Sequence, residues 1–330
     1  MTAGFVDLQV NGYAGRDFTN AALTDEDVWA VSGELGRRGT AGFCPTVITT
    51  SWEVYEHVLP ILARACKEDA AGRRVYSRPL GIHLEGPFIS PMDGAVGAHP
   101  KAHVQAPSIP ALERLLELAD GQVRLLTLAP EVEGARGLIP CARHYGVAVS
   151  IGHTLAGAEA IDQAVAAGAT LSTHLGNGCP NQIHRHENPI WPQLGIRELG
   201  AMIITDGHHL PPAVIAAILA AKGVRRTIVT SDAVSVAGLP PGEYETMGLR
   251  VILEPSGRVR NAQAPTLAGS SACMLDCMNH LARVCCLLEA EDLWRIGRDN
   301  PLAAIRASID DLALGVEVQW DGLQFSVTPN

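Results

Sequence analysis

Two histidines follow two neighbouring strand-like segments of this chain. Val147–Ile151 is a short β-branched run that precedes His153, and Thr170–Thr173 is a second short run that leads to His174. The Ala-rich segment between them, 158–167, has an apolar face and is typical of a helix. A strand–helix–strand unit returns its second strand parallel to the first. We therefore expect both histidines at the same end of nearby strands, where they could share a metal ion.

Other predicted strands are also followed by an ionisable or polar residue. Leu80–Leu84 leads to Glu85, and Thr227–Thr230 leads to Asp232. Further polar residues at predicted strand ends are Gln9, Asn11, His83, His208 and His209. Because the strands themselves are otherwise apolar, this repetition favours a common functional site.

Glu85, His153 and His174 together provide two imidazoles and one carboxylate. Such a set suits Zn²⁺ or a similar divalent ion and leaves a coordination position open for water. A metal ion lowers the pKa of its bound water, and Asp232 could accept the proton and later pass it to a leaving group. Two alternatives stay open. A single histidine at a strand end is more often a structural hydrogen-bond partner, and the whole set could be solvated polar residues at the mouth of a barrel.

Eight predicted strands must position these residues. They begin near residues 5, 43, 80, 123, 147, 170, 201 and 227. The helices between and around them are expected at 24–38, 52–71, 109–119, 135–145, 158–167 and 211–221. Successive βα units of this number predict an α/β fold, the (β/α)8 or TIM barrel, in which catalytic groups gather at the carboxyl ends of the strands.

The pattern changes after Asp232. The expected elements are a β-hairpin, three helices and two short strands, at 243–260, 273–288, 291–298, 301–308 and 316–327. We expect a metal-dependent hydrolase barrel built from residues 1–240 and 262–310. A small β accessory segment would consist of residues 241–261 with 311–330.

The composition limits the partners of the chain. Its net charge of −10 argues against nucleic acid or an anionic membrane surface as the main partner. The first residues show no signal-peptide pattern, and no apolar run approaches membrane length. The 8 cysteines show no CxxC spacing and are typical of reduced, mostly buried thiols. These features predict a cytoplasmic protein that acts on a small molecule.

A series of short motifs contains the candidate residues. DLQVNG (7–12), GIHLEGPF (81–88), IGHT (151–154), THLGN (173–177), TDGHH (205–209), SDA (231–233) and LAGS (267–270) occur in this order. Together they resemble the N-acetylglucosamine-6-phosphate deacetylases of the amidohydrolase superfamily, over most of the chain. HLEGPF and the TH-L-x-N pattern are the specific parts of this resemblance.

The resemblance implies roles for individual residues. Glu85, His153 and His174 match the metal ligands of the family, and Asp232 matches its catalytic acid and base. His99, in the loop after the third strand, matches a histidine that contacts the acetyl-bearing end of the substrate.

The resemblance also implies a phosphate-binding region. Asn177 and Gly178 match a pair whose backbone amides approach the phosphate, and His209 matches a substrate-binding histidine. Arg185 stands where the family places a phosphate-binding arginine, a role that suits the planar fork of its guanidinium. The alternative is that Arg185 belongs to a solvated loop cluster with the histidines on either side of it.

Three departures from the family pattern are visible. Gln9 and Asn11 stand where many amidohydrolases carry two histidines for a second metal, so a one-metal site is favoured; His83 is a further candidate to line the site. The asparagine after the sixth strand lies among glycines and a cysteine in place of an aromatic residue and Ala-Met, which leaves the exact sugar open. The chain starts almost at the first barrel strand, so the β-sandwich of the family is expected to be reduced or missing.

These features predict a hydrolase that deacetylates an N-acetylated amino-sugar phosphate with metal-activated water. The expected cofactor is one divalent ion, with Zn²⁺ favoured over Fe²⁺ or another metal, and the family implies a homodimer. Two other functions stay open. One is an amidohydrolase that acts on an N-acyl amino acid, a cyclic amide or a lactone and needs no phosphate pocket. The other is a non-catalytic protein that binds a sugar phosphate.

Overall fold

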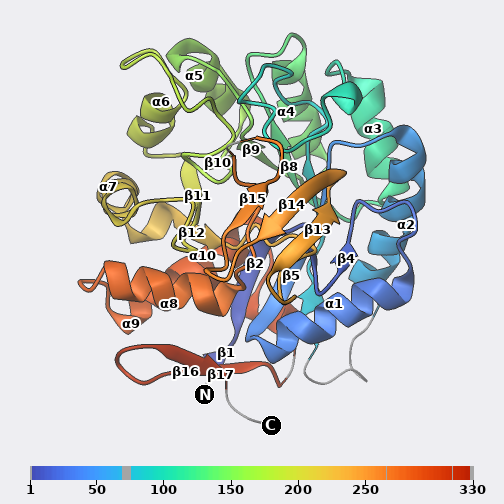
Figure 1. Cartoon of the computed structure of the whole chain (residues 1–330). Coiled ribbons are helices and arrows are strands. Elements are labelled where there is room, and N and C mark those ends of the chain that lie inside the picture. Colours follow the sequence, from blue (N-terminus) through green and yellow to red (C-terminus); the bar gives the residue numbers. More distant parts are fainter. Residues whose placement is uncertain (1, 69–75, 265, 314, 328–330) are drawn as a thin grey trace.

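Eight parallel strands form a nearly closed barrel, which confirms the predicted fold (Figure 1). The structure is a computed structural model that describes residues 2–68, 76–264, 266–313 and 315–327. Neighbouring barrel strands follow the order of the chain. Their bounds are β2 Phe5–Val10, β5 Thr40–Ile48, β7 Ile82–Glu85, β8 Val123–Leu128, β9 Ala148–Ile151, β10 Leu171–Ser172, β11 Gly200–Ile204 and β12 Thr227–Thr230. The two-residue strand β6, Arg78–Pro79, pairs with β5.

Contacts between β2 and the end of β12 close the barrel. Val10 forms a parallel bridge with Ala233. The buried carboxylate of Asp7 accepts hydrogen bonds from Oγ1 of Thr230 at 2.7 Å and from the backbone N–H of Ser231 at 3.1 Å. Burial raises the pKa of Asp7, and these donors oppose the rise. The first and last strands are thereby joined, so that the carboxyl ends of all eight strands surround one mouth.

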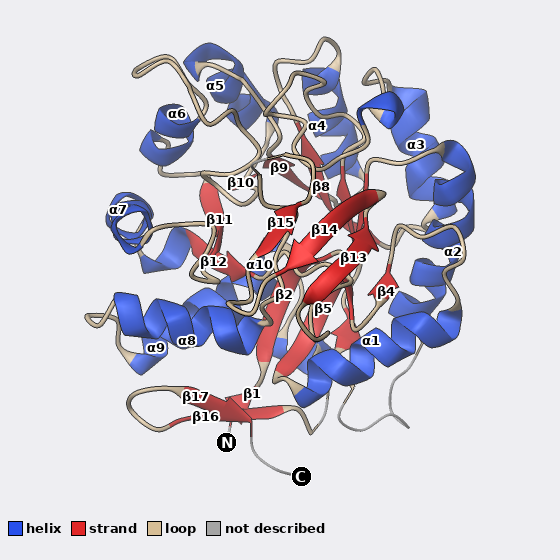
Figure 2. Ribbon diagram, in the orientation of Figure 1, coloured by secondary structure: helices blue, strands red, loops and turns tan. Residues whose placement is uncertain are grey.

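Helices cover the outside of the barrel (Figure 2). Their bounds are α1 Asp25–Arg37, α2 Trp52–Lys67, α3 Ile109–Leu118, α4 Ala135–His144, α5 Ala158–Ala167, α6 Ile190–Gly195, α7 Pro212–Lys222, α8 Met274–Val284, α9 Ala290–Trp294 and α10 Asn300–Ala304. Thr24 caps α1 through a reciprocal pair of side-chain and backbone hydrogen bonds with Asp27. Residues 69–71 of the helix predicted at 52–71 lie outside the described part of the chain. No helix within the described ranges has both the length and the apolar character to cross a membrane.

The helix α6 lies in a segment for which no helix was predicted. It is short and follows Asn188, whose Oδ1 accepts hydrogen bonds from the backbone N–H groups of Ile190 at 2.9 Å and Trp191 at 3.3 Å. A side-chain oxygen that satisfies the first N–H groups is the usual start of a helix. The prolines around Asn188 make the start of this helix difficult to predict from the sequence.

The segment between α9 and α10 is a π-helix, η4, Arg295–Asp299, rather than the end of a regular helix. Gly297 lies within it, and a Cβ there would come within 2.9 Å of Cδ1 of Phe5. The ring of Phe5 also stacks on Trp294 at 5.2 Å between centroids and meets Phe325 edge-on at 4.9 Å. The C-terminal segments therefore pack tightly on the first barrel strand. The helix predicted at 273–288 ends at Val284, at the end of α8.

Two separate three-stranded antiparallel sheets accompany the barrel. The first consists of β13 Gly242–Thr246, β14 Leu249–Leu253 and β15 Val259–Asn261, so the predicted hairpin has a third strand. The second consists of β1 Thr2–Ala3, β16 Glu317–Trp320 and β17 Phe325–Val327, which includes both strands predicted near the end of the chain. A further pair, β3 Gly12–Tyr13 and β4 Arg16–Asp17, follows β2. The proposal that 241–261 and 311–330 form one accessory segment stays a prediction, and residues 314 and 328–330 of it lie outside the described ranges.

Candidate active site

Three side chains meet over the carboxyl ends of β7, β9 and β10. Oε1 of Glu85 lies 3.1 Å from Nε2 of His153 and 2.9 Å from Nε2 of His174, and the two nitrogens are 3.1 Å apart. All three residues are buried. In a tetrahedral site with Zn–N bonds of about 2.0–2.1 Å, neighbouring ligand atoms lie about 3.3 Å apart. The spacing of these three atoms therefore fits a shared metal ion.

The backbone at these strand ends adopts a conformation that few side chains tolerate. The φ angle is +50° at His153, +29° at His174 and +51° at Asp232. Such left-handed conformations cost about 1–3 kcal/mol each for non-glycine residues and gather at functional sites. All three side chains line one cavity. The strained turns thus coincide with the residues that the sequence singled out.

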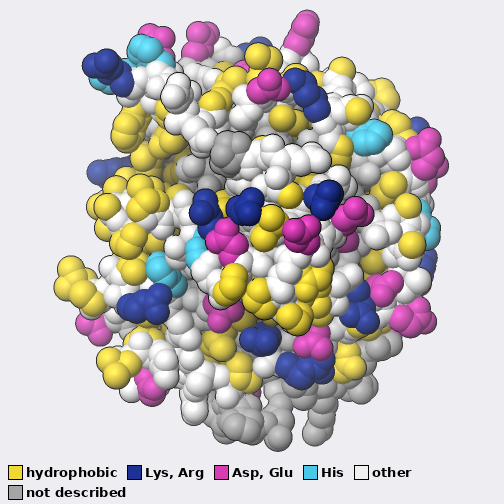
Figure 3. Space-filling view, in the orientation of Figure 1, with side chains coloured by type: hydrophobic (Ala, Val, Ile, Leu, Met, Phe, Trp, Pro, Cys, Tyr) yellow, Lys and Arg dark blue, Asp and Glu magenta, His cyan; other side chains and the backbone are white. Residues whose placement is uncertain are grey.

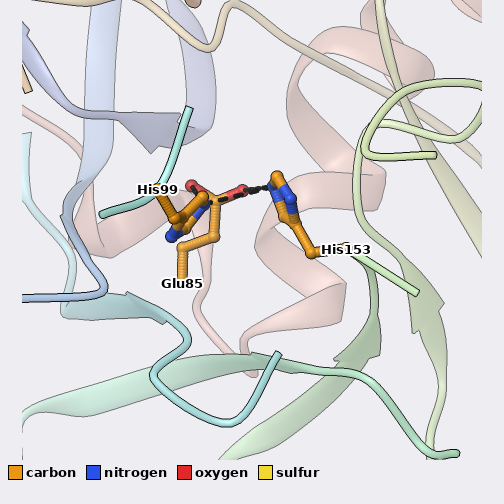
Figure 4. A group of neighbouring side chains, drawn as sticks. All are labelled: Glu85, His99 and His153. Atoms are coloured by element: carbon orange, nitrogen blue, oxygen red, sulfur yellow. Dashed lines mark hydrogen bonds and ion pairs between the residues drawn. The ribbon is translucent and has the colours of Figure 1, made fainter. Parts of the chain in front are cut away.

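His99 reaches the same cluster from the loop between β7 and α3 (Figure 4). Its Nε2 lies 3.2 Å from Nε2 of His153 and 3.7 Å from Oε2 of Glu85. The ligand atoms of Glu85, His99 and His153 all lie within 4.8 Å of one another, which fits a divalent metal site. Because His99 is in a loop, only the family resemblance pointed to it, and no strand-end pattern could have done so.

The remaining ring nitrogens of these histidines have different partners. Nδ1 of His99 accepts a hydrogen bond from the backbone N–H of Thr49 at 3.3 Å and lies 3.0 Å from Oγ1 of the same residue. Nδ1 of His153 lies 2.8 Å from the carbonyl oxygen of Ala95, which can only accept. Nδ1 of His174 is buried and has no hydrogen-bond partner among the described residues. A neutral His99 therefore carries its proton on Nε2, whereas His153 presents a lone pair there.

Asp232 faces the cluster from the end of β12. Its Oδ1 accepts hydrogen bonds from the side-chain amides of Asn11 at 2.7 Å and Gln9 at 3.0 Å. The same nitrogen of Gln9 lies 2.9 Å from Oε1 of Glu85. Burial, and next the negative charge of Glu85, raise the pKa of Asp232 to about 7. A carboxyl group that titrates near neutrality is suited to accept and return a proton.

A cavity of about 360 Å³ opens at this cluster. The predicted site residues that line it are Asn11, Glu85, His153, His174, Asn177, Gly178, His209 and Asp232. Glycine leaves room for the imidazole rings at two points. A Cβ at Gly97 would lie 3.0 Å from Cε1 of His153, and one at Gly178 would lie 3.1 Å from Cε1 of His174. The cavity therefore combines a buried acidic and imidazole floor with close-fitting backbone walls.

His209 is held in place by Asp206 at the end of β11. Nδ1 of His209 lies 2.8 Å from Oδ2 of Asp206, whose other oxygen accepts the backbone N–H of His209 at 2.9 Å. Burial alone would raise the pKa of Asp206, but the hydrogen bond and charge of His209 lower it to about 2. With Nδ1 engaged, Nε2 is the ring nitrogen of His209 that remains for a ligand in the cavity.

Four predicted residues are not among those that line the cavity. Two of them, Gln9 and His99, still contact Glu85 or His153, and the other two are His83 and Arg185. His83 is buried, with Nδ1 3.1 Å from the carbonyl oxygen of Leu8 and Nε2 2.8 Å from Oγ1 of Thr127. Both of its nitrogens are thus engaged inside the barrel. Arg185 is exposed in the loop before α6, and its carbonyl oxygen accepts a hydrogen bond from Nε1 of Trp191 at 2.7 Å. A site-lining role for His83 and a phosphate-binding role for Arg185 stay predictions.

Arg258 is a cavity residue that sequence analysis missed. It is the one Lys or Arg among the described residues that line the cavity, and it lies in the turn between β14 and β15. Figure 3 shows basic side chains with acidic neighbours over the area where β14 and β15 lie. Arg260 pairs with Glu254 at 3.2 Å, whereas the exposed guanidinium of Arg258 has no carboxylate within 4.0 Å in the described ranges. The sequence pattern of a hairpin does not indicate which end of the barrel the hairpin covers, so it could not point to Arg258.

Comparison with characterised proteins places the chain in a family. No family model matches it. It is 35% identical over 292 residues to the N-acetylglucosamine-6-phosphate deacetylase of Bos taurus, an alignment that covers 85% of this chain and 68% of the relative. The chain belongs to the N-acetylglucosamine-6-phosphate deacetylase family. It is also 29% identical over 332 residues to the N-acetylgalactosamine-6-phosphate deacetylase of Escherichia coli O157:H7, which covers 97% of this chain and 85% of that deacetylase.

A solved structure of the deacetylase family shares the architecture. The N-acetyl-D-glucosamine-6-phosphate deacetylase of Mycobacterium smegmatis matches with a TM-score of 0.86 at 28% identity, over 99% of this chain and 85% of that one. The resemblance predicted from the motifs is therefore confirmed for nearly the whole chain.

Proposed function

We propose that this protein is a metal-dependent hydrolase that removes the acetyl group from an N-acetylated hexosamine 6-phosphate. The observation that carries the proposal is the buried cluster of Glu85, His153 and His174 at the cavity floor, with Asp232 beside it. The side-chain amide of Gln9 contacts both Glu85 and Asp232. Relatives named above act on the gluco or the galacto sugar. Both epimers are therefore candidate substrates.

One divalent ion would be held by Glu85, His153 and His174. The lone pair at Nε2 of His153 and the mixed nitrogen and oxygen donors suit Zn²⁺ better than Mg²⁺ or Ca²⁺, and Fe²⁺ is compatible with the same donors. When bound, such an ion polarises a carbonyl oxygen and lowers the pKa of water. Gln9 and Asn11 direct neutral amide N–H groups at the carboxylates, so we expect no second ion.

His99 would donate a hydrogen bond to the substrate rather than bind the metal. The N–H of Thr49 makes Nδ1 the acceptor, so Nε2 carries the proton. Burial, and next the charge of His153, lower the pKa of His99 to about 3, and the ring is neutral at pH 7. A fixed N–H at this position stabilises the oxyanion that develops on the acetyl carbonyl.

Asp232 would act first as general base and then as general acid. In its ionised form it takes a proton from the attacking water, and it returns that proton to the amine as the amide C–N bond breaks. Its Oδ1 is already fixed by the amides of Asn11 and Gln9, which leaves Oδ2 for the proton.

The phosphate end of the substrate would be met by Arg258 and His209. Glu85 and Asp232 give the floor negative charge, and a guanidinium at the mouth offsets it for an anionic substrate and can bind phosphate oxygens in pairs. The backbone N–H of Asn177 already donates to the carbonyl of His174 at 2.9 Å, so of the predicted pair the amide of Gly178 remains. Arg185 would act on a phosphate only from another copy of the chain, in the homodimer that the family implies.

The cytoplasmic location stays a prediction. All 8 cysteines are free thiols, as is usual in a reducing compartment.

A deacetylation screen tests the proposal. The metal-loaded protein is offered N-acetylglucosamine and N-acetylgalactosamine, each with and without the 6-phosphate, and an N-acyl amino acid, a cyclic amide and a lactone. We expect acetate release from a 6-phosphate sugar, with kcat/KM about 100-fold above that of the same sugar without phosphate, as one well-placed charged contact supplies. Turnover of the other substrates instead would favour an amidohydrolase of different specificity. Tight binding of the sugar phosphate without turnover would favour a binding protein.

A further inference from the structure

A second cavity lies at the amino-terminal end of the barrel strands. Its volume is about 280 Å³, and its walls include Ala148, Leu171 and Gly200, the first residues of β9, β10 and β11. The histidines and Glu85 stand at the opposite ends of the strands. At about 3.3 Å per residue, β11 alone separates the two ends by roughly 15 Å. The cavity is therefore distinct from the candidate active site.

Four arginines line this cavity. Arg143 comes from the last turn of α4, Arg225 and Arg226 from the short 3₁₀ helix η3 (Val224–Arg226), and Arg306 from the chain after α10. All four side chains are exposed. No acidic residue lines the cavity, and within the described ranges none of the four guanidinium groups has a carboxylate within 4.0 Å. The one hydrogen bond that any of them makes to a described residue joins Nη1 of Arg143 to the carbonyl oxygen of Gly168 at 3.3 Å.

The positive charge extends beyond the cavity. A neighbouring cavity of about 440 Å³ shares Arg306 and adds Arg78 and Arg124, with Asp311 as its acidic lining residue. Lys222 lies nearby, where its Nζ donates to the carbonyl oxygen of Ile196 at 2.6 Å. Burial, and next the charge of Arg226, lower the pKa of Lys222 to about 8, while Glu198 opposes this. In a chain of net charge −10, this end of the barrel is a local region of positive potential.

Repulsion among the four arginines destabilises the folded chain, and a bound anion would remove that repulsion. Like charges gathered on a concave, low-dielectric surface repel one another and concentrate the electric field there. Guanidinium groups that approach from three different elements can each offer paired N–H donors, and a phosphate accepts them on several faces, whereas a carboxylate offers a single edge. The volume lies just below the range of drug-sized ligand pockets, which suits a small molecule.

We propose that this cavity is a binding site for a small phosphate-bearing anion, separate from the catalytic mouth.

Inorganic phosphate is the probe that tests the proposal. The thermal midpoint of the metal-loaded enzyme is followed as phosphate is added, with sodium chloride at matched ionic strength as reference. The cavity variant is Arg225→Gln with Arg306→Gln. The control variant is Arg37→Gln with Arg64→Gln, which removes the same charge from exposed arginines that pair with Glu34 and Asp25. Both variants keep the catalytic mouth intact, so phosphate bound there contributes equally to each.

We expect phosphate at ten times its dissociation constant to raise the midpoint of the wild type and the control by about 2 °C beyond the chloride effect, and the cavity variant to lose that gain. Calorimetric titration should show one phosphate fewer per chain in the cavity variant. In chloride alone its midpoint should equal or exceed that of the wild type, because repulsion is relieved. An equal phosphate gain and equal stoichiometry in cavity and control variants would overturn the proposal. If the double variant does not fold, Arg306→Gln alone is measured against Arg37→Gln by the same criteria.

Discussion

The side-chain amide of Asn11 donates a hydrogen bond to Oδ1 of Asp232 at 2.7 Å. This contact joins the end of the first barrel strand to the end of the last. It places a donor against the carboxyl group whose pKa burial and Glu85 raise to about 7. A hydrogen bond donated to a carboxylate stabilises the ionised form. Asn11 therefore opposes the rise and helps to keep Asp232 ionised near neutral pH.

Replacing Asn11 with Ala should move the acidic limb of the kcat/KM profile to higher pH. Without the donor the ionised form of Asp232 is less stable, its pKa rises, and the base is lost at a higher pH than in the wild type. A hydrogen bond of about 1 kcal/mol corresponds to roughly 0.7 pH unit. Asn181→Ala, a change at the same cavity, serves as control and should leave the limb in place. A lower rate with an unmoved limb would contradict the assigned effect.

Asp232→Asn should abolish turnover while the metal content stays intact. The amide keeps the shape of the side chain but cannot accept a proton from water, so kcat should fall about 1,000-fold. Elemental analysis measures the metal content, and steady-state kinetics on the same preparation measures kcat. Activity comparable to the wild type would remove Asp232 from the catalytic step.

His153→Asn should lower the metal content, whereas His99→Asn should leave it unchanged. Nε2 of His153 offers a lone pair because its Nδ1 faces a carbonyl oxygen, whereas Nε2 of His99 carries a proton because its Nδ1 accepts from Thr49. We expect the His153 variant to lose most of its metal. The His99 variant should keep it and lose about 100-fold in kcat, as for one oxyanion donor. Metal loss in both variants would show that His99 is a ligand.

Arg258→Ala and Arg185→Ala separate two candidate phosphate contacts. Arg258 lines the cavity and Arg185 does not. We expect Arg258→Ala to raise KM for the 6-phosphate sugar about 10- to 100-fold, in line with 1.5–3 kcal/mol for a charged hydrogen bond, and to leave the unphosphorylated sugar unaffected. Arg185→Ala should alter KM only if its loop reaches the site of a second copy. Sedimentation of both variants at assay concentration shows whether a dimer is present. A KM effect from Arg185→Ala alone would refute the role of Arg258.

The barrel strands and the residues at the floor of the cavity were predictable from the sequence, because both follow from patterns within short segments. Alternating strand and helix patterns predicted all eight strands, and polar residues at strand ends predicted Glu85, His153, His174 and Asp232, which the structure brings to one cavity. Parallel strands carry their carboxyl ends to one edge, so the order of the chain suffices for this step.

The walls of the site were not predictable in the same way. Arg258 reaches the mouth from a hairpin whose placement depends on tertiary packing, and no pattern within the hairpin encodes that placement. His83 is the converse case, a strand-end histidine whose ring turns into the barrel towards Leu8 and Thr127. The alternation of side chains along a strand indicates which residues face the inside of the barrel. It does not indicate whether such a residue lines the cavity or packs in the core.

Asp206→Asn should weaken both stability and substrate binding. The folded-state pKa of Asp206 is about 2, below its usual value of 3.8, so its ionised form is stabilised by folding. That contribution, about 2 kcal/mol by linkage, is present in full above pH 4 and is lost as the pH falls through 2. Urea unfolding of metal-free protein should therefore show a constant difference between wild type and variant from pH 7 to 5, which shrinks below pH 4. Because Asp206 also orients His209, KM should rise with little change in kcat. A difference that persists unchanged down to pH 2.5 would mean that the carboxylate charge is not what stabilises this pair.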